Sequence, residues 1–187
     1  MAVGKSSIIQ RIIHNRFLFS LASGGHGEGF HIYFEKATFF IDCYDDFGQE
    51  KYWPILCYKY PHADGIILVY DITDRYSFEV CKDYFEEKIN VLCPKNIKKI
   101  LLGNKSDLED KRVIKIEEGL NFAEKYGYKF DEISCRYNKN VFKAFEEFIM
   151  EVINNKKING DFIYKQNNYL KLQTPEIKYK KKKSPCQ

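Results

Sequence analysis

The chain has 187 residues, 44% of them apolar and 16% aromatic, a composition that can bury the core of one globular domain. No run approaches the ~18 consecutive apolar residues of a membrane-spanning helix, and no secretion signal opens the sequence, so we expect a cytoplasmic protein. The formal net charge is +4, but residues 156–187 alone hold nine lysines against two acidic residues, so the remainder does not indicate a nucleic-acid-binding face.

The first expected element is a helix that directly follows the motif G-K-S at residues 4–6. Apolar residues recur at helical spacing from Ile8 to Phe17. At the start of a helix, the ammonium group of Lys5 can reach phosphate oxygens and the hydroxyl of Ser6 can bind Mg²⁺, beside free N–H groups and the helix dipole. Three common residues also occur together by chance, so a solvated N-terminus is the alternative interpretation of this motif alone.

Two extended segments and a glutamine-containing loop are expected next. Residues 31–36 and 37–44 are predicted as strands around a short turn, the second well buried because it is mostly apolar and aromatic. The following loop contains D-x-x-G-Q. Asp45 can hold Mg²⁺, Gly48 lets the backbone approach a terminal phosphate, and Gln49 can orient an attacking water.

Two short aliphatic runs, GIILVYD at 65–71 and KKILLGN at 98–104, are predicted as interior parallel strands with binding loops at their carboxyl ends. A helix is expected between them, because apolar residues recur at helical spacing from Phe78 to Leu92. Another helix is expected over 116–126, ending at Gly127.

The remaining elements are a short strand within KFDEIS, residues 129–134, and a helix with an apolar stripe from Val141 to Ile153. Strands that alternate with helices at this spacing predict an α/β fold. We expect a mostly parallel open sheet, helices on both faces and ligands at the strand ends.

The loop LLGNKSDL places Asn104, Lys105 and Asp107 directly after an aliphatic strand. A carboxylate there can accept hydrogen bonds from both the ring N–H and the exocyclic amine of guanine, and adenine does not offer that pair of donors. Residues 133–136, ISCR, follow at the next strand end and would form the other wall of the guanine-binding site. A polar loop that caps a helix is the alternative interpretation of this tetrapeptide alone.

These motifs occur in order, each at the end of an apolar run, and the sequence resembles the Ras superfamily of small GTPases, most closely its Rab branch. The resemblance runs from Ala2 to about Ile153 and includes GIILVYDITDRYSF and NFAEKYGYKFDEISCRYNKNV. It implies a P-loop small G domain over residues 1–153 that binds GTP or GDP with Mg²⁺. It also implies a switch in vesicle trafficking, with effectors, exchange factors and GTPase-activating proteins as partners.

The resemblance also implies roles for individual residues. Lys105 would flank the base, and residues 134–136 stand where the family usually has S-A-K. The implied site comprises Val3, Gly4, Lys5, Ser6, Ser7 and Gly48 for phosphate; Asn104, Lys105, Asp107, Ser134, Cys135 and Arg136 for guanine; Ser6, Ser23 and Asp45 for Mg²⁺; and Gln49 for catalysis.

The chain departs from the family pattern at three places. The family's phosphate loop begins with an earlier Gly at the end of a central strand, and both would precede Met1, so we expect a domain without its first strand. Ser23 is the nearest hydroxyl to the Thr that reaches Mg²⁺ in the family. Residues 46–47 are Asp-Phe where the family has Thr-Ala, so we expect Gln49 to be misplaced and intrinsic hydrolysis to be slow.

Residues 154–187 are predicted to be a flexible basic tail. Rab proteins usually end in prenylated cysteines, which implies lipidation of Cys186 and a peripheral position on the cytosolic face of a membrane, although Cys186 is not in a C-a-a-X box. Five nearby lysines would add about 1 kcal/mol each at an anionic membrane. A disordered tail with an unmodified thiol is the alternative. The other cysteines form no C-x-x-C pair and are expected to be reduced and mostly buried.

Other functions remain open on the sequence alone. A pseudo-GTPase would keep the binding surfaces of the fold without a working switch, as the unusual switch residues allow. A truncated, non-functional product is a second possibility. A nucleoside-monophosphate kinase would share G-K-S, but it would need a lid with several arginines, and N-K-S-D favours guanine.

Overall fold

The computed structural model describes residues 2–17, 28–34, 37–44 and 57–158. Three strands, β3 (Gly65–Asp71), β4 (Lys98–Asn104) and β5 (Lys129–Glu132), form a parallel sheet in that order. Two further strands, β1 (Glu28–Phe34) and β2 (Ala37–Cys43), pair antiparallel as a separate sheet. Residues 2–4 form no strand.

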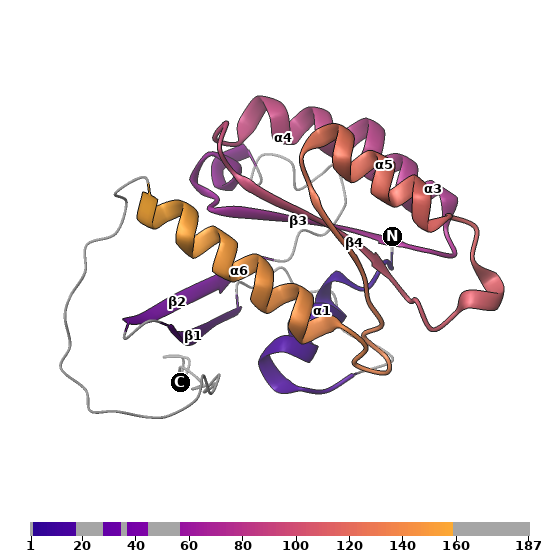
Figure 1. The fold of residues 1–187 in the computed structure, drawn as a ribbon, viewed down its shortest axis with the longest axis horizontal. Helices are drawn as coiled ribbons and strands as arrows, with labels where there is room; N and C mark the ends of the chain where they lie inside the picture. The colour runs from indigo at the N-terminus through magenta and orange to yellow at the C-terminus, as the bar shows by residue number, and fades with distance from the viewer. Residues whose placement is uncertain (1, 18–27, 35–36, 45–56, 159–187) are drawn as a thin grey trace.

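Helices cover both faces of the parallel sheet, as the alternating pattern predicts (Figure 1). One face carries α3 (Arg75–Glu79), the π-helical segment η3 (Val80–Phe85), α4 (Glu86–Leu92) and α5 (Ile116–Tyr126). The other face carries α1 (Lys5–His14) and α6 (Val141–Ile158), with the β1–β2 hairpin beside them. Two short 3₁₀ turns, η2 (Tyr60–His62) and η4 (Glu109–Lys111), lie in connections.

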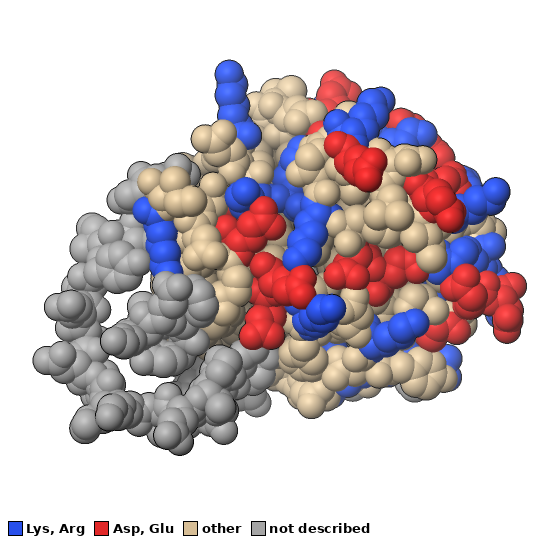
Figure 2. Space-filling model, viewed as in Figure 1, with Lys and Arg blue, Asp and Glu red and all other residues tan. Residues whose placement is uncertain are grey.

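Alternation along the strands divides the core into two clusters, one on each face of the sheet. In β3, Ile67 and Val69 pack with α1, α6 and the hairpin, whereas Leu68 and Tyr70 pack with α3, α4 and α5. This two-sided burial is the pattern that a short, continuously apolar run predicts for an interior parallel strand. On the face seen in Figure 2, acidic and basic side chains of the described residues are interspersed.

The predicted bounds of β3, β4 and α5 agree with the structure, and Gly127 closes α5 in the left-handed conformation at φ 71°. The predicted final helix continues to Ile158, so the boundary expected at residue 154 falls inside α6. No helix in the described ranges is long and apolar enough to span a bilayer.

The expectation that β2 would be well buried is wrong. Only its alternate residues Phe39, Ile41 and Cys43 pack against the core, and all three are half-buried. Phe40 points the other way and is 50% exposed. An apolar and aromatic composition therefore did not distinguish a strand buried on one face from a strand buried on two.

Candidate functional site

The N-terminus of α1 meets the carboxyl ends of β3 and β4 (Figure 1). Gly4 precedes the helix with φ 96°, in the left-handed region that favours glycine. A Cβ at Gly4 would lie 2.2 Å from the side-chain nitrogen of Asn104, so the close approach also requires glycine. The first-turn N–H groups of α1 therefore lie beside the loop that carries Asn104.

Asn104 joins three segments that are far apart in the sequence. Its side chain is buried, its Nδ2 donates to the carbonyl of Val3 at 2.8 Å, and its Oδ1 accepts from the N–H of Cys135 at 3.3 Å. The amide thus links the residues before α1, the loop after β4 and the loop after β5. Each end of the amide makes one hydrogen bond inside the protein, so the side chain of Asn104 holds these loops together.

Asp107 is positioned by Ser134. The hydroxyl of Ser134 is buried and donates to Oδ1 of Asp107 at 2.5 Å. The main chain of Ser134 exchanges hydrogen bonds with Lys139, at 3.0 Å in each direction, which fixes the loop that carries the hydroxyl. Among the described residues, Oδ2 of Asp107 has no hydrogen-bond partner. A half-buried carboxylate with one fixed and one available oxygen can accept two adjacent N–H donors.

Lys105 points toward the end of β3 and is held there. Its backbone is left-handed, with φ 67°, and its Nζ lies 2.5 Å from Oδ2 of Asp71. The other oxygen of this buried carboxylate accepts from the N–H and the hydroxyl of Thr73 at 2.9 and 2.7 Å. Asp71 was not among the predicted site residues. The signal that could have identified it is its position as the single acid that ends a buried strand.

One thiol at the site, Cys135, and one in the core on the other face of the sheet, Cys81, are buried and protonated. Burial raises the pKa of Cys135 to about 12, although Arg11 opposes the shift. Burial also raises the pKa of Cys81 in η3 to about 12, although Lys5 opposes the shift. Neither thiol is a candidate nucleophile, because a nucleophilic cysteine needs a lowered pKa.

The structure thus places the residues predicted to bind phosphate, Val3 to Ser7, next to the residues predicted to bind guanine. Arg136 is exposed, and its guanidinium lies over the ring of Tyr137 at 5.3 Å. Arg11 was also missed, although it is a charged residue on the apolar stripe of α1 and is buried in the structure. The predicted residues Ser23, Asp45, Gly48, Gln49 and Cys186 lie outside the described residues.

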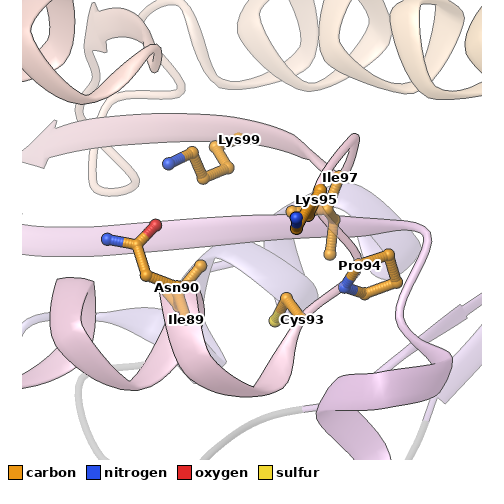
Figure 3. A pocket seen from close by; sticks show the side chains of 7 residues that line it. All are labelled: Ile89, Asn90, Cys93, Pro94, Lys95, Ile97 and Lys99. Atoms are coloured by element: carbon orange, nitrogen blue, oxygen red, sulfur yellow. The ribbon is translucent and has the colours of Figure 1, made fainter.

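A small cavity lies at the opposite end of β4 from Asn104 (Figure 3). It has a volume of about 140 Å³ and is lined by Ile89, Asn90, Cys93, Pro94, Lys95, Ile97 and Lys99. Lys99 belongs to the first residues of β4, whereas the candidate site is built on the last. The cavity is therefore separate from that site.

Comparisons with known proteins place the site in context. The model of the Ras family matches residues 1–154. The chain is 40% identical over 166 residues to the Ras-related protein RABA4a of Arabidopsis thaliana, covering 83% of this chain and 70% of that protein. It is 37% identical over 166 residues to the Ras-related protein Rab11D of Nicotiana tabacum, covering 83% and 72%. It is 36% identical over 129 residues to the GTP-binding protein ypt2 of Schizosaccharomyces pombe, covering 68% and 64%.

Proposed function

The chain belongs to the Ras family and is a Rab-like small GTPase of vesicle trafficking, and we propose that its guanine nucleotide binds where α1 meets the carboxyl ends of β3, β4 and β5. Ras-family GTPases bind GTP or GDP together with Mg²⁺ and act with regulators and effectors. The observation that carries the placement is the pair formed by Ser134 and Asp107 beside the start of α1.

Asp107 would select the base. One carboxylate oxygen is fixed by Ser134 and retains a second lone pair, and the other oxygen is available. Two adjacent acceptors match the ring N–H and the exocyclic amine of guanine, whereas adenine presents no such pair of donors. The ion pair between Lys105 and Asp71 would hold the aliphatic stem of Lys105 along the side of the base.

The first turn of α1 would bind the phosphates. Backbone N–H groups at a helix start favour anions through their hydrogen bonds and through the helix dipole. Lys5 adds a positive charge at the same end of the helix, and Ser6 adds a hydroxyl. An oxygen donor such as Ser6 fits Mg²⁺, and Ser23 and Asp45 are proposed as further ligands from the sequence. The metal would neutralise charge on the phosphates.

We propose that GTP hydrolysis follows nucleotide binding at a slow intrinsic rate. Gln49 would orient the water that attacks the terminal phosphate in line, and Lys5 would stabilise the negative charge that moves to the leaving group. Asp46 and Phe47, next to the proposed Mg²⁺ ligand Asp45, are the reason to expect a slow rate, because a bulky ring and a second carboxylate beside the phosphate disfavour the reacting geometry.

The membrane contact is proposed on sequence grounds. A prenyl group on Cys186 together with the neighbouring lysines would give the two signals that stable anchoring needs. The protein would then be peripheral on the cytosolic face of a membrane, where effectors, exchange factors and GTPase-activating proteins would meet it.

Binding of a fluorescent GDP analogue in the presence of Mg²⁺ tests the proposal. We expect unlabelled GDP and GTP to displace the analogue and ATP not to. Asp107→Asn should weaken GDP binding by about a hundredfold, because hydrogen bonds to a charged acceptor are lost. The same variant should gain affinity for xanthosine diphosphate, because xanthine has an exocyclic carbonyl oxygen in place of the exocyclic amine of guanine and this oxygen can accept from the new amide. Asp110→Asn, an exposed change on η4, is the matched control and should bind GDP normally.

Two results would contradict the proposal. Equal displacement by ATP and GTP would show that Asp107 does not select the base. Failure of the unchanged chain to bind any guanine nucleotide would favour the pseudo-GTPase interpretation, in which the domain binds partners without a nucleotide switch.

A further inference from the structure

Arg11 is a buried charged side chain in the middle of α1. It is 9% exposed and lies between the buried residues Ile8 and Ile12. Its guanidinium donates to main-chain carbonyl oxygens: Nε and Nη2 to Cys135 at 3.0 and 2.7 Å, Nη2 to Arg136 at 3.1 Å, and Nη1 to Asn15 at 3.2 Å. No carboxylate is among its hydrogen-bond partners in the described ranges, so three carbonyl dipoles compensate the positive charge.

The same peptide segment is also held from its other side. The N–H of Cys135 donates to Asn104, and the side chain of Asn104 donates to Val3, just before α1. A closed circuit of hydrogen bonds therefore runs from Val3 through Asn104 and Cys135 to Arg11 and back along α1. Ser134, the residue that holds Asp107, directly precedes Cys135, which belongs to this circuit.

We infer that Arg11 is a positioning residue that couples the phosphate-binding start of α1 to the guanine-selecting loop after β5. This inference rests on the proposed nucleotide site. Arg11 touches neither the base nor the phosphates; it acts through the carbonyls of Cys135 and Arg136, which set where the hydroxyl of Ser134 meets Asp107. The phosphate contacts of α1 and the base contacts of Asp107 then depend on the same hydrogen-bonded segments. Binding at either place therefore also stabilises the other.

The chemistry of the side chain supports this role. The planar guanidinium presents five donors in a fixed fork, and here the fork spans two successive carbonyls on one side and the C-cap residue of α1 on the other. A lysine would keep the charge but would present a single ammonium group that cannot span the same set. A methionine would keep most of the apolar stem and lose every donor.

The test compares two nucleotides on the full chain. Inosine diphosphate differs from GDP only by the absence of the exocyclic amine, so the ratio of the two affinities reports specifically on the contact with Asp107. In Arg11→Met, we expect this ratio to fall about tenfold and the dissociation rate of a fluorescent GDP analogue to rise about tenfold. Arg11→Lys should lie between Arg11→Met and the unchanged chain. Arg16→Met, an exposed arginine beyond the end of the same helix, should change neither quantity.

The outcomes separate this inference from the proposal beneath it. If the unchanged chain binds no guanine nucleotide, the proposed function fails and the inference fails with it. If the unchanged chain prefers GDP and Arg11→Met or Arg11→Lys weakens GDP and inosine diphosphate by the same factor, Arg11 only stabilises the fold and the inference alone is overturned. Urea unfolding of each variant supplies the stability change, and Arg11→Lys carries the test if Arg11→Met does not fold.

Discussion

Ser134 has the most direct influence on Asp107 of any described side chain, because its hydroxyl donates to the carboxylate at 2.5 Å from a buried position. Ser134→Ala would remove this donor and let the carboxylate rotate. We expect the affinity for GDP to fall about tenfold and the free energy of unfolding to fall by about 1 kcal/mol. Titration with a fluorescent GDP analogue and urea unfolding measure the two effects.

A hydroxyl removed from the same loop at an exposed position controls for this experiment. Tyr137 is 67% exposed, so Tyr137→Phe should leave GDP affinity unchanged. If Ser134→Ala also binds GDP as tightly as the unchanged chain, the hydroxyl does not position Asp107 for the base.

Residues of the site differ in how far the sequence could predict them. Asn104 and Asp107 were predictable because their motif immediately follows an aliphatic strand, and the structure places them where parallel strands end. Arg11 and Asp71 were missed because their partners are distant in the sequence. Arg11 bonds to carbonyls more than a hundred positions away, and Asp71 bonds to Lys105 across the strand ends. Residue type alone does not reveal a partner of that kind.

Among the elements, α5 gives a prediction that runs against helix propensity. Gly119 lies in its interior, where alanine would ordinarily stabilise by about 1 kcal/mol. A Cβ at Gly119, however, would lie 2.5 Å from the ring of Phe130 and 2.8 Å from the hydroxyl of Tyr70. We therefore expect Gly119→Ala to lower the free energy of unfolding by about 1 to 3 kcal/mol, because the packed core cannot make room.

Urea unfolding measures this change, and Asn121→Ala on the exposed side of α5 is its control. The control should stabilise by a few tenths of a kcal/mol, since propensity alone acts there. Equal stabilisation by both substitutions would show that α5 shifts away from the sheet easily and that Gly119 is not required by packing.

The elements were predicted well where the apolar pattern was unambiguous and less well where it was not. A stripe from Phe78 to Leu92 predicted one helix, and the structure contains the π-helical segment η3 within it. One extra residue in a turn hardly alters such a stripe, so the spacing cannot reveal it. The N-terminal end of this helix was not predicted either; it is capped by Asp74, which accepts from the N–H of Tyr76 at 3.0 Å.

At the scale of the whole molecule, the parallel sheet separates two apolar clusters, and each contains a buried thiol. Cys81 lies in the cluster formed with α3, α4 and α5, and Cys135 lies in the cluster formed with α1 and α6. The sequence predicted reduced and mostly buried cysteines. The described cysteines are free, but only Cys81 and Cys135 are buried, whereas Cys43, Cys57 and Cys93 are half-buried. The sequence could not predict how far burial moves the pKa values of Cys81 and Cys135, because that depends on the packing of the complete core.

These two thiols predict a loss of stability in alkali. The ordinary thiol pKa is 9.0, and burial raises the pKa of Cys81 and Cys135 to about 12 in the folded protein. Between these values the unfolded chain has lost the protons that the folded chain retains, so the unfolded state binds fewer protons and stability falls as pH rises. Each thiol should lower the free energy of unfolding by about 1.4 kcal/mol per pH unit above pH 9 and leave it unchanged below pH 8.

Urea unfolding at pH 7, 9 and 10.5 measures this loss of stability. The variant Cys81→Ala tests how much of the loss comes from the thiol of Cys81. The substitution leaves a cavity whose cost is the same at every pH, so only the slope carries information about the thiol. We expect the slope above pH 9 to be smaller by about 1.4 kcal/mol per pH unit in Cys81→Ala than in the unchanged chain. Parallel curves for the two proteins would mean that the thiol ionises in the folded state, and that the cluster between the sheet and α5 admits water more readily than its burial indicates.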